Sequence, residues 1–79
     1  MMYVYILQSL SDPKRSYTGI TEDLKQRLHK HNSGDVTHTS EHRPWRLNTY
    51  VAFSDIIRAR AFEMYLKSAS GRAFASKCL

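Results

Sequence analysis

At 79 residues the chain is long enough for one small hydrophobic core and too short for two, so we expect a single domain spanning residues 1–79. Its 42% hydrophobic content excludes a disordered chain, and no apolar run approaches the roughly 20 residues that a membrane-spanning helix needs. Twelve Lys and Arg residues against seven Asp and Glu residues give a net charge of +5, which leaves two alternatives open: a nucleic-acid partner, or a basic surface without one.

Two short apolar runs near the N-terminal end predict a β-hairpin. The run Tyr3–Leu7 is β-branched, aromatic and apolar on both faces, so we expect a central strand that is covered on both sides. A polar turn at residues 11–15, which contains a proline, separates this strand from a second one at Ser16–Ile20. Two strands joined by so short a turn are expected to pair in antiparallel fashion.

A first helix is expected from Glu22 to Asn32, because Thr21 can cap its first turn and Gly34 provides a stop signal. Residues 34–44 are polar, and we expect an irregular loop there. Long loops are uncommon in small domains and are often functional, so this segment is a candidate for substrate contact.

The segment from Trp45 to Phe53 alternates between apolar and polar residues, which predicts a third strand. A regular strand would place alternate residues on opposite faces of the sheet. We therefore expect one face to carry Leu47, Thr49, Val51 and Phe53, and the other to carry Arg46, Asn48, Tyr50 and Ala52.

A second helix is expected after a cap at Ser54 or Asp55. Gly71 should interrupt it, and residues 72–77 should form a short C-terminal helix. The element order β-β-α-β-α predicts an α+β fold in which a small three-stranded antiparallel sheet is flanked by helices. The apolar stripe that would pack on the sheet comprises Ala59, Phe62, Leu66 and Ala69.

Two tyrosine motifs lie on the expected hairpin, Tyr3-Val4-Tyr5 and Tyr17-Thr18-Gly19, and Arg27 and Glu63 follow on the two expected helices. In order and spacing these four elements resemble the GIY-YIG nuclease family over nearly the whole chain. The stretch from residue 66 to residue 74 also looks like the end of the short single-domain members. The first motif departs from the family pattern because a tyrosine replaces its glycine, but the tyrosine at the third position is kept.

The resemblance implies a metal-dependent endonuclease that hydrolyses phosphodiester bonds in DNA, structure-selective or repair-related, with one Mg²⁺ or Mn²⁺ ion. By the same resemblance Tyr5 and Tyr17 orient the attacking water and the phosphate, Arg27 stabilises the transition state, and Glu63 holds the metal. An asparagine that many family members carry about a dozen residues further on is missing here. The alternative is therefore a nucleic-acid-binding module that keeps the fold with little or no cleavage.

Each of these candidate catalytic residues also has a purely structural interpretation. Tyrosines are common in strands and often pack their rings with the hydroxyl at the rim of the core. An arginine such as Arg27 is frequently a solvated surface residue. Glu63 is spaced to form an i, i+4 ion pair with Lys67, which would contribute only a few tenths of a kcal/mol.

Further candidates lie close to these residues in the sequence. His31 follows Arg27 by four positions and is either a catalytic histidine or one favoured by the helix dipole at a C-terminal end. Gly19 either leaves room for a substrate phosphate or provides a flexible strand end. The expected loop is either a phosphate-backbone contact or a solvated surface. The candidate substrate-binding residues are His38 and Arg43 in the loop and Arg46 just after it.

Cys78 is the single cysteine, so the chain forms no internal disulfide and has no cysteine pair for zinc. Together with an N-terminal segment that lacks the pattern of a signal peptide, this predicts a cytoplasmic location. Since larger family members owe their specificity to added domains, a protein partner that supplies specificity is a further expectation.

Overall fold

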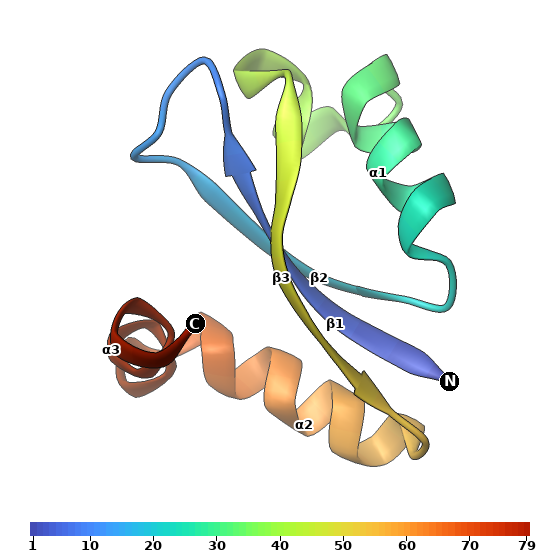
Figure 1. Ribbon diagram of the computed structural model, residues 1–79, viewed down its shortest axis with the longest axis vertical. Coiled ribbons are helices and arrows are strands. Elements are labelled where there is room, and N and C mark those ends of the chain that lie inside the picture. Colours follow the sequence, from blue (N-terminus) through green and yellow to red (C-terminus); the bar gives the residue numbers. More distant parts are fainter.

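The computed structural model describes residues 1–79 and contains a three-stranded antiparallel sheet in the order β2-β1-β3. Helix α1 and a 3-10 helix, η1, lie at one face of this sheet, and α2 and α3 cover the other face (Figure 1). This arrangement confirms the α+β class. The elements are β1 (Met2–Ser9), β2 (Ser16–Thr21), α1 (Leu24–Ser33), η1 (Thr37–His42), β3 (Trp45–Phe53), α2 (Ile56–Lys67) and α3 (Ala69–Cys78).

The central strand β1 is buried on both faces, as its apolar sequence predicts. Tyr5 and Leu7 point toward α1 and pack with Trp45. Val4 and Ile6 point the opposite way, into a second cluster built with residues of α2. The two clusters form the core on either side of one strand, so β1 fixes the position of everything that packs on it.

The pairing of β1 with β2 determines how the two tyrosine motifs meet. Tyr5 lies directly opposite Gly19, and Leu7 lies opposite Tyr17. Tyr17 is therefore a diagonal neighbour of Tyr5 on the same face of the sheet. Since β2 is an edge strand, this face of β2 lies at the rim of the molecule.

Strand β3 has the predicted bounds, but the apolar side chains at its two ends lie on opposite faces of the sheet. The register with β1 shifts between Ile6 and Leu7, so that Leu47 pairs with Leu7 and Thr49 pairs with Ile6. Asn48 is left unpaired as a β-bulge. The prediction of one continuous apolar face was wrong, because the bulge turns Leu47 toward α1 and Phe53 toward α2.

Helix α1 starts two residues later than predicted, and its cap is Asp23 rather than Thr21. The Asp23 carboxylate accepts a hydrogen bond from the backbone N–H of Gln26 at 3.0 Å. Gly34 ends the helix as predicted, with φ of 87° and its N–H donating to the carbonyl of Lys30.

The segment predicted to be an irregular loop contains the 3-10 helix η1, which is attached to the core. Thr39 is only 1% exposed. Its carbonyl accepts a hydrogen bond of 2.8 Å from the indole N–H of Trp45. The loop prediction missed this element because its sequence is polar, and the anchor that orders it lies outside the segment.

Helix α2 is capped by Asp55, one of the two predicted caps. Two differences appear further on: Ser68 rather than Gly71 separates the helices, and Ala69 begins α3 instead of extending the apolar stripe of α2. Gly71 lies in the first turn of α3, where a Cβ atom would come within 1.7 Å of the Tyr65 carbonyl oxygen. Its role is to let α3 approach the end of α2.

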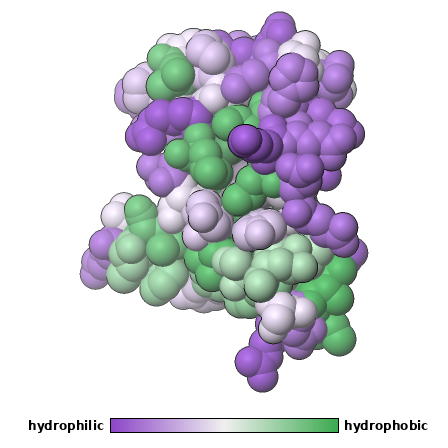
Figure 2. Space-filling view, turned by 45° about the vertical axis from the view of Figure 1, so that its right-hand side comes forward, coloured by the Kyte–Doolittle hydropathy of each residue, from purple (hydrophilic) through white to green (hydrophobic).

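Polar side chains cover the upper part of the molecule in Figure 2, whereas apolar ones gather over the lower part, formed by α2 and α3. On α2 the most exposed of these are Ile57 and Met64, with exposed fractions of 75% and 71%. None of the helices is both long enough and apolar enough to cross a membrane.

Candidate active site

Tyr5 reaches from the central strand across the edge strand β2. The residue is 1% exposed, and its ring lies over Gly19, where a Cβ atom would come within 2.4 Å of the Tyr5 hydroxyl oxygen. The space beside Gly19, which one of the two alternatives for this residue left to a substrate phosphate, is filled by the Tyr5 phenol. Gly19 is needed because only glycine allows the hydroxyl to reach this strand.

The Tyr5 hydroxyl is held in a buried chain of hydrogen bonds. It lies 3.0 Å from Nε2 of His31, and Nδ1 of His31 lies 2.8 Å from the Thr39 hydroxyl oxygen. The Thr39 hydroxyl donates to the carbonyl of Val36 at 3.3 Å, so its oxygen accepts from Nδ1–H. His31 is therefore the tautomer whose Nε2 accepts the Tyr5 proton.

The electrostatic environment keeps both groups of this pair neutral near pH 7. The pKa of Tyr5 is raised to about 12, chiefly by burial; the Arg27 guanidinium opposes this rise through a hydrogen bond and its charge, and the Tyr17 and Glu63 side chains add to it. Burial, and then the charge of Arg27, lower the pKa of His31 below its usual 6.5. Tyr5 is therefore a hydrogen-bond donor at neutral pH and is not itself ionised.

Arg27 and Glu63 belong to the two helical layers that lie on opposite faces of the sheet. Arg27 is a partly buried residue of α1, and Glu63 belongs to α2 on the other face of the sheet. Both side chains influence the pKa of Tyr5: Arg27 lowers it through a hydrogen bond and its charge, and the charge of Glu63 raises it. Arg27 is therefore the nearer candidate partner of the Tyr5 hydroxyl, and Glu63 acts on it from the other face of the sheet.

Glu63 also forms the ion pair that its spacing predicts as a structural alternative. Its carboxylate lies 3.2 Å from Nζ of Lys67, and the two side chains are 18% and 51% exposed. The carboxylate therefore has a cationic neighbour in this structure. An exposed partner of this kind holds it only weakly, since such helix pairs contribute about 0.3–0.5 kcal/mol.

Tyr17 occupies the accessible side of the site. Its ring centroid lies 4.9 Å from that of His31 and 6.3 Å from that of Tyr5. Tyr17 is partly exposed, whereas Tyr5 and His31 are buried. Of the two tyrosines, Tyr17 is the one that water and substrate can reach.

The three candidate substrate-binding residues in and after the predicted loop lie in different places. His38 is an exposed residue of η1. Arg43 donates from Nε to the carbonyl of Ser40 at 2.8 Å and lies against Gly34, so it closes the turn between α1 and η1. Arg46 pairs with Gln8 on the other face of the sheet from Tyr5, and the structure does not bring it into the site.

The donors around Glu63 fit a loosely held hard cation. No three His, Cys, Asp or Glu side chains come together in a way that would enclose a metal ion. Mg²⁺ keeps several of its waters and commonly binds through one or two carboxylates plus substrate phosphates. A single, partly exposed carboxylate matches that mode.

Thr39 is the residue of this site that the sequence did not reveal. It lies in the segment predicted to be irregular, and its only sequence signal is a position eight residues after His31. Through its hydrogen bond to Nδ1 it sets which ring nitrogen faces Tyr5. We interpret Thr39 as a positioning residue, because its hydroxyl bonds His31 and the Val36 carbonyl and not Tyr5.

Replacing Thr39 with valine is expected to leave His31 no longer restricted to a single tautomer. The near-isosteric change leaves the buried Nδ1 without its partner, at a cost of about 1–3 kcal/mol in unfolding free energy. Nitrogen-15 NMR of the imidazole should show loss of the single Nδ1–H tautomer, whereas Thr39→Ser should keep it. An unchanged tautomer in Thr39→Val would contradict the assignment.

The amino-acid sequence matches one protein family and two curated relatives. The GIY-YIG catalytic domain family matches residues 1–76. The chain is 40% identical over 74 residues to "Structure-specific endonuclease subunit SLX1" of Candida dubliniensis, an alignment that covers 84% of this chain and 26% of that protein. It is 35% identical over 65 residues to "Structure-specific endonuclease subunit SLX1 homolog" of Giardia intestinalis, covering 77% of this chain and 18% of that protein. The chain thus spans about a quarter or less of the length of these relatives.

Proposed function

The chain belongs to the GIY-YIG catalytic domain family, and from this premise we propose that it is a metal-dependent endonuclease that hydrolyses phosphodiester bonds in DNA. The observation that supports the proposal is the buried Tyr5–His31 hydrogen bond beside the partly exposed Tyr17, with Arg27 and Glu63 both influencing the pKa of Tyr5. An open site of this kind suits a substrate larger than the domain.

We assign different roles to the two tyrosines because their surroundings differ. Tyr17 meets water, so its hydroxyl orients the attacking water on phosphorus and takes up the water proton as the phenolic proton leaves to solvent. Tyr5 is buried and stays protonated. Its hydroxyl is hydrogen-bonded to His31 and also interacts with the Arg27 guanidinium. Tyr5 and His31 are in this view positioning residues.

Arg27 stabilises the charge that develops on the phosphate oxygens as the new P–O bond forms and the bond to the 3′ oxygen breaks. A guanidinium is suited to this because it can donate two parallel hydrogen bonds to phosphate. Its place beside a buried, low-polarity phenol increases the strength of such an interaction. Glu63 would hold Mg²⁺ or Mn²⁺, which supplies charge stabilisation for the phosphate and the leaving oxygen when bound.

The substrate and partner follow from what the relatives are called. Both carry names with "structure-specific" and "subunit". We infer that this chain cuts branched DNA in association with another protein. The exposed apolar side chains of Ile57 and Met64 on α2 support a protein contact there.

The proposed function is tested by cleavage of end-labelled DNA in the presence of Mn²⁺, with branched, single-stranded and duplex substrates compared. The unmodified chain should cut, chelation should stop cutting, and Arg27→Ala should cut about 10²–10³-fold more slowly because it loses one transition-state contact. The exposed Arg58→Ala, on the side of α2 away from Glu63, is the control.

Two outcomes would reject parts of the proposal. Equal rates for Arg27→Ala and Arg58→Ala would contradict the role of Arg27. Salt-sensitive DNA binding without any cut product would support the alternative, a DNA-binding module without cleavage. The observation in favour of that alternative is the ion pair that Glu63 forms with Lys67.

A further inference from the structure

An open groove of about 550 Å³ runs along β2 next to the active site, and four cationic side chains line it. They come from the β1–β2 loop and from the junction of α2 with α3. No carboxylate lines the groove, and its floor includes the apolar residues Ile6, Leu66 and Ala75. We call it the basic groove; its cations are Lys14, Arg15, Lys67 and Arg72.

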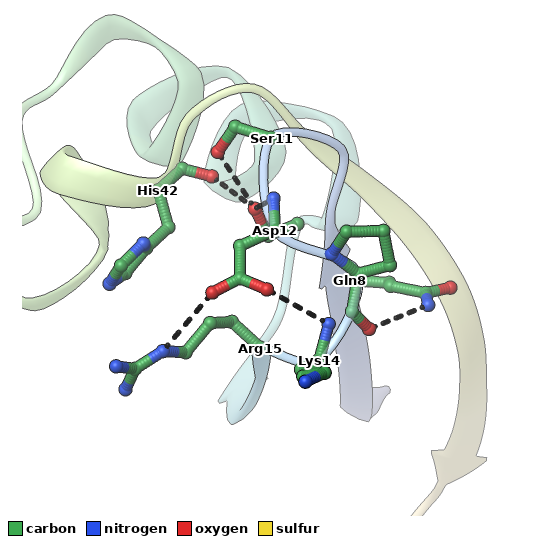
Figure 3. Close-up of polar contacts among 8 residues, drawn as sticks. Gln8, Ser11, Asp12, Lys14, Arg15 and His42 are labelled. Carbon is green, nitrogen blue, oxygen red and sulfur yellow. Dashed lines mark hydrogen bonds and ion pairs between the residues drawn. The ribbon is translucent and has the colours of Figure 1, made fainter.

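Asp12 contacts both residues that carry the cations of the β1–β2 loop, through the backbone of Lys14 and the side chain of Arg15 (Figure 3). One oxygen of the Asp12 carboxylate accepts the backbone N–H of Lys14 at 3.2 Å, and the other lies 3.7 Å from Nε of Arg15. Ser9 ties the base of the loop by accepting from the N–H of Asp12 at 3.0 Å. These bonds order the loop backbone, so that both residues project from a defined turn, and the ammonium of Lys14 has no ion-pair partner.

The two cations on the opposite wall stand at the helix junction. Arg72 lies in the first turn of α3, after the cap at Ser68, and makes no ion pair. The N-terminus of α3 adds its partial positive charge to that wall. Lys67, at the end of α2, pairs with Glu63, so it stands between the groove and the proposed metal ligand.

The basic groove adjoins the candidate active site at the edge strand, because Tyr17 lines the groove and also packs against the His31 ring. A polyanion whose scissile phosphate lies at Tyr17 would extend along β2 into the groove. We propose that the groove binds the phosphate backbone of the DNA strand next to the cleaved bond, an inference that rests on the proposed function. Hydroxyls of Ser16 and Thr18 line the same path and are suited to phosphate oxygens.

A second hollow, beyond the C-terminal end of β2, does not offer such a path. The hollow there is lined by Tyr3 and Tyr50 and contains the carboxylates of Glu22 and Asp23 together with one cation, Lys25. Cations therefore line the groove near the start of β2, whereas two carboxylates follow the end of the strand. A DNA strand that leaves the active site toward the start of β2 meets cations.

The test compares two double variants with the same loss of charge. Lys14→Gln/Arg72→Gln removes the two unpaired cations of the groove, and Lys25→Gln/Arg58→Gln removes two exposed cations away from it. Binding of a fluorescent branched DNA and of its single strand is measured by anisotropy at several salt concentrations, without divalent metal.

The groove variant should bind about tenfold more weakly, with the slope of log K against log salt smaller by about 2, because two phosphate contacts are lost. The control variant should keep the slope of the unmodified chain. Charge-conserving Lys14→Arg/Arg72→Lys should restore binding, which shows that any loss is not due to misfolding.

Equal slopes for the groove and control variants would overturn the proposal. So would normal DNA binding by the groove variant together with lost binding of a polyglutamate peptide, since the groove would then be a protein site. Because binding is measured without metal, a chain that binds through the groove and never cuts would overturn the proposed function and leave the groove assignment in place.

Discussion

Glu63→Gln is expected to reduce DNA cleavage by about a thousandfold or more while leaving the fold intact. Glutamine keeps the volume of the side chain but loses the charge that a hard cation requires. Metal stabilisation of a phosphoryl transition state is worth several kcal/mol, and each 1.4 kcal/mol or so is a factor of ten in rate. The ion pair with Lys67 is also lost, but a pair of this kind contributes little to stability.

Three measurements separate metal binding from folding for this variant. Single-turnover cleavage with Mn²⁺ gives the loss in rate, electron paramagnetic resonance of Mn²⁺ gives the loss of metal affinity, and thermal unfolding checks the fold. Glu22→Gln is the matched control, because Glu22 is exposed and precedes α1. If Glu63→Gln and Glu22→Gln cleave equally well, the metal is held elsewhere or is not required.

The fold could be predicted largely because local signals agree with the tertiary structure. Tyr3–Leu7 reads as a doubly buried strand, Gly34 ends a helix, and the bounds of the third strand match the observed ones. Features that depend on contacts between residues far apart in the sequence could not be predicted from it. The bulge at Asn48 and the close approach at Gly71 arise from how one element meets another, which no periodicity records.

The candidate site divides in the same way. Tyr5, Tyr17, Arg27 and Glu63 were found through a resemblance in order and spacing; in the structure the rings of the two tyrosines are neighbours, and Arg27 and Glu63 both influence the pKa of Tyr5. The difference between the two tyrosines was not predictable, since it depends on burial of Tyr5. Thr39 and the basic groove were also beyond the sequence, because their partners are brought together only by the packing of η1 and by the α2–α3 junction.

Gly19→Ala is expected to disable the site through one methyl group. In an ordinary strand position this change stabilises the chain, because glycine loses more conformational freedom on folding. Here the new Cβ would lie 2.4 Å from the hydroxyl oxygen of Tyr5 and 2.6 Å from the ring carbon that bears it. The phenol must therefore move, which breaks its hydrogen bond to His31. Overpacking of this kind costs about 1–3 kcal/mol, and cleavage should fall with it.

A double-mutant cycle identifies Tyr5 as the cause. Urea unfolding should show a loss of stability for Gly19→Ala in the unmodified chain and a markedly smaller loss in a Tyr5→Leu background, because leucine lacks the atoms that the Cβ would meet. The expected coupling is about 1 kcal/mol or more, within the range for residues in contact. Thr18→Ala, one position away on β2, is the control and should show no coupling to Tyr5. Equal losses for Gly19→Ala in both backgrounds would mean that the glycine serves the backbone of β2 and not the placement of the Tyr5 hydroxyl.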